Sequence, residues 1–280
     1  MDAPRRVGLI VLPRRPKAAA LAAAAGAEIA RLGGAVWEAP RWDAPAVEGS
    51  LPGTDLVICF GGDGTIIHGA QRCALLGVPI VGVNFGKMGF LTEFEPEEFP
   101  DGLPRLLAGD YWLEERITLG VEHRRNGNVL GRHLAVNEAL IGRGRINRVV
   151  TLHTWVDGQY MTSYAADGPV LPPDMQALVM VPVLPFVSFR NALVLCPTSR
   201  VDVQVQIAPP PHHEAVLSVD SGTTVPVENG DRISFAVGEA RCRFARVRPK
   251  HYFHAVLVSK LQRSPILPPL PPDTPPPAQP

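Results

Sequence analysis

The chain has no net formal charge, few cysteines and no long apolar segment, and each deficiency excludes a class of protein. Its 280 residues contain 27 basic and 27 acidic side chains, so the charge balance does not favour binding to nucleic acid or to a membrane surface. The longest apolar run, residues 177–189, is too short to span a bilayer and contains Pro182 and Pro185. The sequence therefore predicts neither a nucleic-acid partner nor a membrane segment.

Cysteine is scarce and widely spaced. The four cysteines, Cys59, Cys73, Cys196 and Cys242, form no CxxC pair and no dense framework. This usage is typical of reduced thiols, and we expect a cytoplasmic protein. The N-terminal apolar run, residues 7–12, is shorter than the apolar region of a secretory signal and lacks its small-residue cleavage site, so we expect a first strand there.

The first hundred residues alternate strand and helix signals. Continuous apolar runs at residues 7–12, 55–60 and 78–83 are typical of strands buried on both faces. The Ala-rich stretch 17–32 has a high helix propensity, and Gly33 and Gly34 follow it. This rhythm predicts a doubly wound parallel α/β domain over residues 1–110.

The residue pattern changes at about residue 111. Short segments rich in Val, Thr and aromatic residues recur between turn signals such as Asn126-Gly127, which predicts an all-β, sandwich-like domain over residues 111–240. We expect residues 241–262 to return to the N-terminal domain. Nine of the 30 prolines lie in residues 265–280, so residues 263–280 are predicted to form a Pro-rich disordered tail.

The most informative string is GGDGT at residues 61–65, which follows a buried strand and precedes a helix. Glycines let the backbone approach an anion, and a helix N-terminus offers free N–H donors, so the string predicts a phosphate-binding loop. Its members are Gly61, Gly62, Gly64 and Thr65. Asp63 would repel a phosphate unless it holds Mg²⁺ or takes a proton from an attacking hydroxyl. A tight turn with Asp63 as the helix N-cap is the structural alternative, and the residue types leave both open.

Four strings together resemble NAD kinase. They are GGDGT at 61–65, GVNFGKMGFLTE at 82–93, VNE at 136–138 and LSVD at 217–220. The similarity runs from about Val7 to Leu261. GGDGT by itself also fits diacylglycerol and sphingosine kinases and, more loosely, phosphofructokinase, whereas the second and third strings favour NAD kinase.

The resemblance implies that ATP, or polyphosphate, phosphorylates the 2′-hydroxyl of the adenosine ribose of NAD to give NADP, with Mg²⁺ or another divalent metal. It implies that Asp63 is the general base, and it assigns no residue to the metal. The residues that it implies for NAD binding are Asp63, Gly64, His68, Asn137, Glu138, Arg148 and Asp167. For His68 and Arg148 a solvated surface side chain is the alternative. Family members form dimers or tetramers, which implies a homo-oligomer.

One departure from the family pattern follows Asp167-Gly168. In the family this pair runs on into a strand and the motif TPTGSTAYSLSAGGP, whereas here Gly168 is followed directly by PVLP. This predicts an internal deletion of a strand and a binding loop. The chain is then an impaired relative, a relative that compensates with other residues, or an incompletely recorded sequence. The alternative function is accordingly a degenerate NAD(P)-binding protein with impaired or no kinase activity. Gly222 also stands where the family usually carries a substrate-contacting Gln.

Two further features carry weaker expectations. Asp220 has no evident partner in the sequence and is expected to be a turn residue. A run of basic residues near the C-terminus is interpreted either as steering anionic nucleotides or as the solvated face of a strand. Its members are Arg241, Arg243, Arg246, Arg248 and Lys250.

Overall fold

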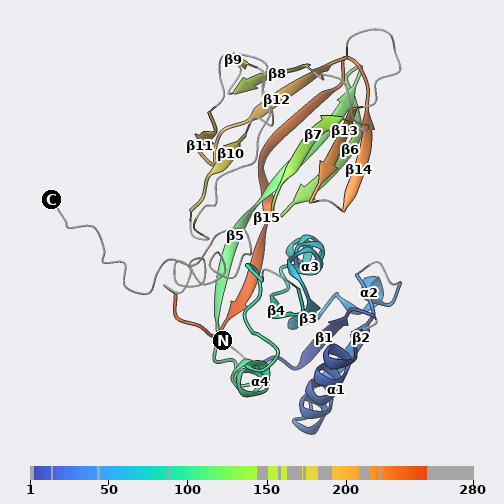
Figure 1. Cartoon of the computed structure of the whole chain (residues 1–280), viewed down its shortest axis with the longest axis vertical. Helices are drawn as coiled ribbons and strands as arrows, with labels where there is room; N and C mark the ends of the chain where they lie inside the picture. The colour runs from blue at the N-terminus through green and yellow to red at the C-terminus, as the bar shows by residue number, and fades with distance from the viewer. Residues whose placement is uncertain are drawn as a thin grey trace, which may run out of the picture.

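The protein consists of an α/β part and a β-rich part that share two long strands (Figure 1). The computed structural model describes residues 3–13, 15–42, 45–86, 89–143, 151–156, 159–162, 172, 175–181, 191–207, 215–220 and 222–250. The predicted Pro-rich tail, residues 263–280, and the segment 251–262 lie outside the described residues.

The N-terminal part is built on four parallel strands in the order β2-β1-β3-β4. The strands are β1 (Arg6–Val11), β2 (Ala35–Ala39), β3 (Leu56–Gly61) and β4 (Ile80–Asn84), and the helices are α1 (Pro16–Arg31), α2 (Pro45–Ser50), α3 (Asp63–Leu76) and α4 (Phe99–Leu107). Helices α1 and α4 supply the core on one face of the sheet, and α2 and α3 supply it on the other. All residues of β3 and β4 are therefore buried, which explains their continuous apolar runs. The predicted α/β class is confirmed.

The C-terminal part is antiparallel and β-rich, as predicted. Its strands are β5 (Trp112–Arg125), β6 (Asn128–Ala135), β7 (Ala139–Arg143), β8 (Thr151–Val156), β9 (Gln159–Thr162), β10 (Leu178–Met180), β11 (Leu193–Leu195), β12 (Val201–Gln206), β13 (Ala215–Val219), β14 (Thr223–Val227) and β15 (Arg232–Arg246). A three-stranded sheet, β14-β13-β7, packs on β5, β6, β12 and β15 through a shared apolar core. Val121 and Ile233 enter this core from the larger sheet, and Leu217 enters from the smaller one.

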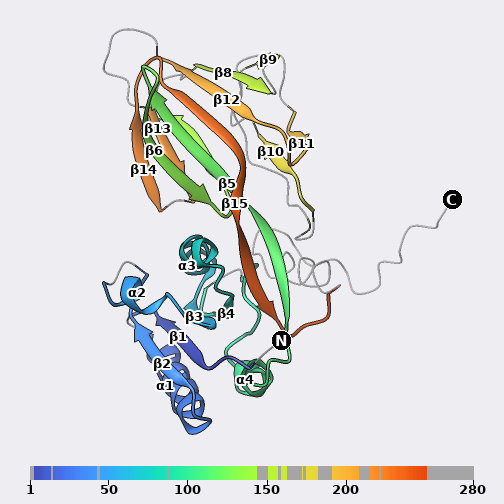
Figure 2. The same ribbon diagram turned by 180° about the vertical axis from the view of Figure 1, so that it is seen from behind.

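Strands β5 and β15 run through both parts and fix their arrangement (Figure 2). They pair from Arg232↔Arg124 to Arg246↔Trp112, with a register shift between Val237 and Arg241. The far end of β15 lies parallel to β4 through Phe244↔Ile80, so the four strands of the α/β part and six strands of the β-rich part belong to one ten-stranded sheet. In both views helix α3 lies at the junction, below the sheets of the β-rich part.

The cysteines are free thiols. Cys59, Cys73 and Cys242 are buried and Cys196 is exposed. Burial raises the pKa of Cys59 and of Cys242 to about 12, so both behave as small apolar core residues. Among the described residues, no helix has the length and apolar character required to span a membrane.

Candidate active site

The GGDGT turn lies at the carboxyl end of β3, where open α/β sheets bind ligands. Gly62 is the N-cap of α3, and its extended backbone (φ −96°, ψ −179°) lets its carbonyl accept the N–H groups of Thr65 and Ile66 at 3.0 and 3.1 Å. Asp63 is the first residue of the helix, and no side chain caps this end. The interpretation of Asp63 as the N-cap is therefore wrong.

The Asp63 carboxylate is held by a different segment of the chain. The N–H of Phe90 donates to Oδ2 at 3.0 Å, and the N–H of Leu91 donates to Oδ1 at 2.8 Å. Asp63 is half-buried. Each carboxylate oxygen receives one of these donors, and a carboxylate has about four acceptor sites. The side chain therefore has a fixed orientation and retains acceptor capacity toward a ligand.

Two glycine turns pack against each other beside Asp63. A Cβ on Gly86 would lie 2.9 Å from the Cα of Gly62, and one on Gly62 would lie 3.2 Å from the Cα of Gly86. The turn after β4 is set by Asn84, whose Oδ1 accepts the N–H of Gly86 at 3.0 Å. This close approach of two backbones explains why both positions require glycine.

The loop that orients Asp63 is anchored by a buried ion cluster. Arg246, only 1% exposed, donates to the carbonyl of Leu91 at 3.1 Å and pairs with Glu93 at 3.4 Å and Glu114 at 3.1 Å. Glu93 Oε1 also accepts the N–H groups of Val247 and Arg248. Burial raises the pKa of Glu93, against the opposing effect of Arg246. We expected Arg246 either to steer anionic nucleotides or to lie on the solvated face of a strand, and its burial contradicts both expectations.

One face of α3 contacts the β-rich part. Gly64, His68 and Gln71 follow the i, i+4, i+7 spacing of a single helix face. Gly64 is exposed, and a Cβ there would meet nothing within 4 Å. His68 lies against Gly222, where a Cβ would be 2.2 Å from His68 Nε2. The Gln71 amide donates to Asp220 Oδ2 at 2.6 Å.

Asp220 joins this helix face to the turn between β6 and β7. Its carboxylate accepts the N–H groups of Val136 at 2.7 Å, Asn137 at 2.8 Å and Glu138 at 2.8 Å, and its own N–H donates to the carbonyl of Glu138 at 3.0 Å. Asp220 has a positive φ of 47° and lies in the turn after β13. It is a turn residue, as expected, and its partners, which were not evident in the sequence, are the Gln71 amide and three backbone N–H groups.

The predicted site residues thus fall into two connected groups. Asp63, Gly64 and His68 lie on α3, and the exposed residues Asn137 and Glu138 are tied to α3 through Asp220 and Gln71. In the glycine turn, Thr65 packs on Gly61, where a Cβ would lie 2.8 Å from the Cβ of Thr65. Arg148 and Asp167 lie outside the described residues.

Comparison with known proteins shows which family the chain belongs to. The family model described as "ATP-NAD kinase N-terminal domain" matches residues 5–111, and the model described as "ATP-NAD kinase C-terminal domain" matches residues 124–247. The chain belongs to the NAD kinase family. An NAD kinase of Dehalococcoides mccartyi strain CBDB1 is 34% identical over 277 residues, covering 92% of this chain and 96% of the relative. An NAD kinase of Chloroflexus aggregans is 32% identical over 228 residues, covering 75% and 81%. The resemblance in the sequence motifs is confirmed.

Two solved structures share the NAD kinase fold. The yeast NADH kinase complexed with NADH superposes with a TM-score of 0.78 at 16% identity, covering 93% of this chain and 88% of that one. An NAD kinase from Archaeoglobus fulgidus in complex with ATP gives a TM-score of 0.72 at 19% identity, covering 92% and 99%. At these identities the likeness establishes the fold, and it agrees with the two-part architecture.

Sequence reasoning missed the residues that hold this candidate site together. Gln71 and Asp220 are 149 residues apart, and Leu91 and Arg246 are 155 apart. LSVD was part of the motif set, so its acidic residue was visible, but no local pattern shows which backbone groups a distant carboxylate will accept.

A divalent metal in this fold would need ligands from the nucleotide in addition to those from the protein. Within the described ranges, no three His, Cys, Asp or Glu side chains gather closely enough to hold a metal ion. Mg²⁺ in phosphoryl-transfer sites is commonly bound by one or two carboxylates together with substrate phosphates and water. The half-buried Asp63 at the glycine turn fits that arrangement.

Proposed function

We propose that the chain phosphorylates the 2′-hydroxyl of the adenosine ribose of NAD, with ATP or polyphosphate as donor, to give NADP. The observation that carries the proposal is the oriented, half-buried carboxylate of Asp63 at the start of α3, in a chain of the NAD kinase family. The fold neighbours support it, because one was solved with NADH and another with ATP.

Asp63 is the proposed general base. As the 2′-oxygen of the ribose bonds to the terminal phosphorus of the donor, the bond from that phosphorus to its bridging oxygen breaks and ADP leaves. The ribose hydroxyl proton passes to an Asp63 oxygen. A positioned base of this kind contributes roughly 10²–10⁴ in rate. The Phe90 and Leu91 N–H groups keep the carboxylate in one orientation during the transfer.

The remaining binding residues follow from the same arrangement. The glycine turn is proposed to hold phosphate oxygens through Gly61, Gly62, Gly64 and Thr65, since its backbone is open at Gly64 and it begins a helix. His68, Asn137 and Glu138 are proposed to contact NAD from the two sides that Asp220 joins. Arg148 and Asp167 remain proposals that rest on the family resemblance.

Mg²⁺ is proposed to arrive with the donor phosphates. When bound, it would neutralise the negative charge that spreads over the transferring group. Asp63 is the described carboxylate at the glycine turn that would hold it, as the alternative to acting as the base. We also propose a cytoplasmic homo-oligomer, either a dimer or a tetramer.

The second candidate is a degenerate relative that binds NAD(P) with impaired or no turnover. It is favoured by the direct step from Gly168 to Pro169 in the sequence. The alignment with the Dehalococcoides NAD kinase supports a deletion, because its 277 positions include only 92% of these 280 residues. The relative therefore has residues where this chain has none. The predicted junction lies outside the described residues.

Two measurements on the purified chain separate the candidates: NADP formation from NAD, ATP and Mg²⁺, and NAD binding by calorimetry. The kinase proposal expects NADP from the unaltered chain and from Asp101→Asn, an exposed acid on α4, and a loss of turnover in Asp63→Asn. NAD binding without NADP in all three proteins would support the degenerate relative. Absence of both NAD binding and turnover would contradict both candidates.

A further inference from the structure

Both backbone polar groups of Leu91 are held by side chains from other parts of the protein. Its N–H donates to Asp63 Oδ1 at 2.8 Å, and its carbonyl oxygen accepts Nη1 of Arg246 at 3.1 Å. The N–H belongs to the peptide plane before the Leu91 Cα, and the carbonyl belongs to the plane after it. The two contacts therefore restrict both backbone dihedral angles of Leu91, and they link the donor that Asp63 accepts to the position of Arg246.

The rest of this loop is fixed by bonds that do not involve Leu91. The N–H of Glu93 donates to the carbonyl of Gly82 in β4 at 2.9 Å, which holds the end of the loop on the sheet. The Thr92 hydroxyl donates to the carbonyl of Gly89 at 3.0 Å and closes the turn. Since neither bond restrains a peptide group of Leu91 directly, the contact with Arg246 supplies that restraint.

Arg246 is itself held in one position. It lies in β15 and is 1% exposed. Its Nη1 lies 3.4 Å from Glu93 Oε2, its Nη2 lies 3.1 Å from Glu114 Oε1, and its guanidinium carbon lies 5.2 Å from the centroid of the Phe244 ring. A planar guanidinium presents its N–H groups in a rigid fork, so this one side chain reaches two carboxylates and the Leu91 carbonyl together. Burial strengthens these contacts, because water does not compete for them.

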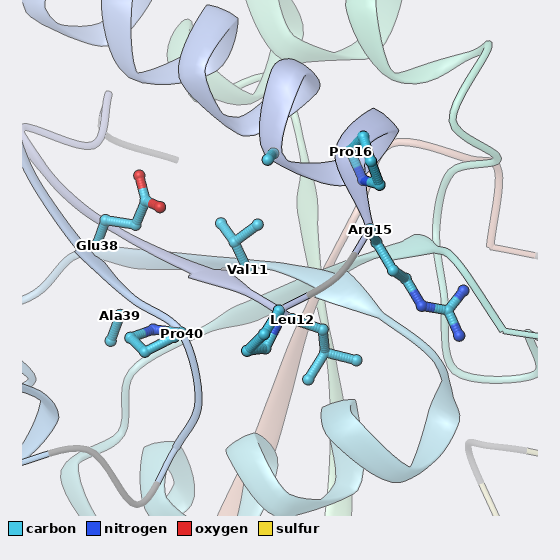
Figure 3. Close-up of a pocket in the computed structure, with 9 residues that line it drawn as sticks. Val11, Leu12, Arg15, Pro16, Glu38, Ala39 and Pro40 are labelled. Carbon is cyan, nitrogen blue, oxygen red and sulfur yellow. The ribbon is translucent and has the colours of Figure 1, made fainter.

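An exposed arginine makes a similar contact with a neighbouring loop. Arg15 lies beside the start of α1, where it lines a cavity of about 460 Å³ (Figure 3), and its Nη1 donates to the carbonyl of Phe85. Its side chain is exposed, so water competes for this bond. The carbonyl that it contacts also lies outside the pair of residues, Phe90 and Leu91, that donates to Asp63. The buried contact of Arg246 is therefore the one that reaches the carboxylate.

We propose that Arg246 is a positioning residue for phosphoryl transfer: it holds Leu91 so that the Leu91 N–H keeps the Asp63 carboxylate aimed at the ribose hydroxyl. The inference rests on the proposed function, in which Asp63 is the base. Arg246 is buried and acts through Leu91, without touching the substrate. A misplacement of about 1 Å at a reacting group can lower a rate roughly 100-fold. Loss of an effect that operates in the transition state lowers kcat and leaves KM unchanged.

The variant that tests the inference is Arg246→Lys. It keeps a cation between Glu93 and Glu114, but it replaces the fork with a single ammonium group that does not span both carboxylates and the Leu91 carbonyl. We expect a kcat for NADP formation about tenfold lower or more, with the KM values for NAD and ATP unchanged within about twofold. The kcat is expressed per folded molecule, with the folded fraction taken from a urea titration.

Arg243→Lys is the matched control. Arg243 lies in the same strand and makes the same kinds of contact, because it donates to the carbonyl of Gly77 at 3.3 Å and pairs with Glu115 at 2.9 Å. Its side chain is 41% exposed, and its contacts lie outside the loop that holds Asp63. We expect Arg243→Lys to have the kcat and the KM values of the unaltered chain.

Amide hydrogen exchange of Leu91 tests the link without turnover. In Arg246→Lys the Leu91 N–H should exchange faster by about tenfold or more, because local opening of the loop becomes easier. A third variant, Val205→Ala, separates this effect from a general loss of stability. Val205 is 1% exposed in the apolar core of the β-rich part, so the variant should lower the urea midpoint and leave both Leu91 exchange and kcat unchanged.

An unchanged kcat or an unchanged Leu91 exchange rate in Arg246→Lys would overturn the inference. A fall in kcat as large in Val205→Ala would also overturn it, because stability alone would then explain the effect. Failure of the proposed function is a different result, namely no NADP from the unaltered chain. In that case the exchange rates still decide whether Arg246 holds the loop: faster exchange in Arg246→Lys alone would support the link to Asp63, and equal exchange would refute it.

Discussion

The Gln71 side-chain amide donates to the Asp220 carboxylate at 2.6 Å, across 149 residues of sequence. The same carboxylate accepts the N–H groups of Val136, Asn137 and Glu138. Helix α3 begins at Asp63, so Asp220 sets the separation between the proposed base and the turn that carries Asn137 and Glu138. We therefore treat Asp220 as a positioning residue.

Replacing Asp220 should loosen NAD binding. Asp220→Asn places an NH₂ group among N–H donors, and leaving a half-buried donor such as the Val136 N–H without an acceptor costs up to about 1–3 kcal/mol. We expect a Kd for NAD about tenfold higher or more, measured by calorimetry, and a lower urea midpoint. The control is Asp110→Asn, an exposed carboxylate paired with Arg105 at the surface. A loss of stability with unchanged NAD affinity would show that Asp220 is purely structural.

The contact between His68 and Gly222 should appear as coupling between two variants. A Cβ at Gly222 would lie 2.2 Å from His68 Nε2, so Gly222→Ala must turn the exposed imidazole away. We expect less than about 1 kcal/mol of lost stability but weaker NAD binding. In a His68→Ala background the same substitution should have little further effect on the Kd for NAD. Strictly additive effects in this double-mutant cycle would show that the two residues act independently.

Arg246 should be among the most sensitive positions outside the apolar core. Arg246→Met leaves Glu93 and Glu114 buried without their shared cation, which costs about 3–5 kcal/mol. The control, Arg243→Met, removes an exposed pair with Glu115 and should cost at most about 1 kcal/mol. Urea denaturation of both variants measures the difference. Similar losses in the two variants would refute a special role for the buried cluster.

Acid should destabilise the β-rich part through Asp231. Burial favours the protonated form, but hydrogen bonds from Arg125, the Glu228 N–H and His123 outweigh it and lower the Asp231 pKa below its ordinary value of 3.8. A carboxyl with a lowered native pKa stabilises the fold above pH 3.8, and that stability is lost as the pH falls through the native pKa.

The matched variant for this pH effect is Arg125→Met. It should lower the free energy of unfolding at pH 7 and reduce its decline below about pH 4, because the Asp231 pKa then lies closer to that of the unfolded chain. Urea denaturation between pH 7 and pH 2.5 measures both effects. If the free energy of unfolding of the variant fell as steeply below about pH 4 as that of the unaltered chain, the assignment to Asp231 would be contradicted.

The sequence predicts the elements of this fold better than the contacts between them. Buried strands such as β3 and β4 are visible because helices on both faces require continuous apolar runs, and the glycine turn is visible because its motif is local. The burial of Arg246 was missed because alternating basic and apolar residues usually mark a strand with a solvated face, and here that face meets Glu93 and Glu114. Residues that bond over more than 100 positions leave no periodic signal.

The most direct test of the account is the initial rate of NADP formation at saturating NAD and ATP with Mg²⁺, compared between the unaltered chain and Asp63→Asn. We predict measurable NADP from the unaltered chain and a kcat at least about 100-fold lower in the variant. A variant that forms NADP at the unaltered rate would contradict the role of Asp63 as the base.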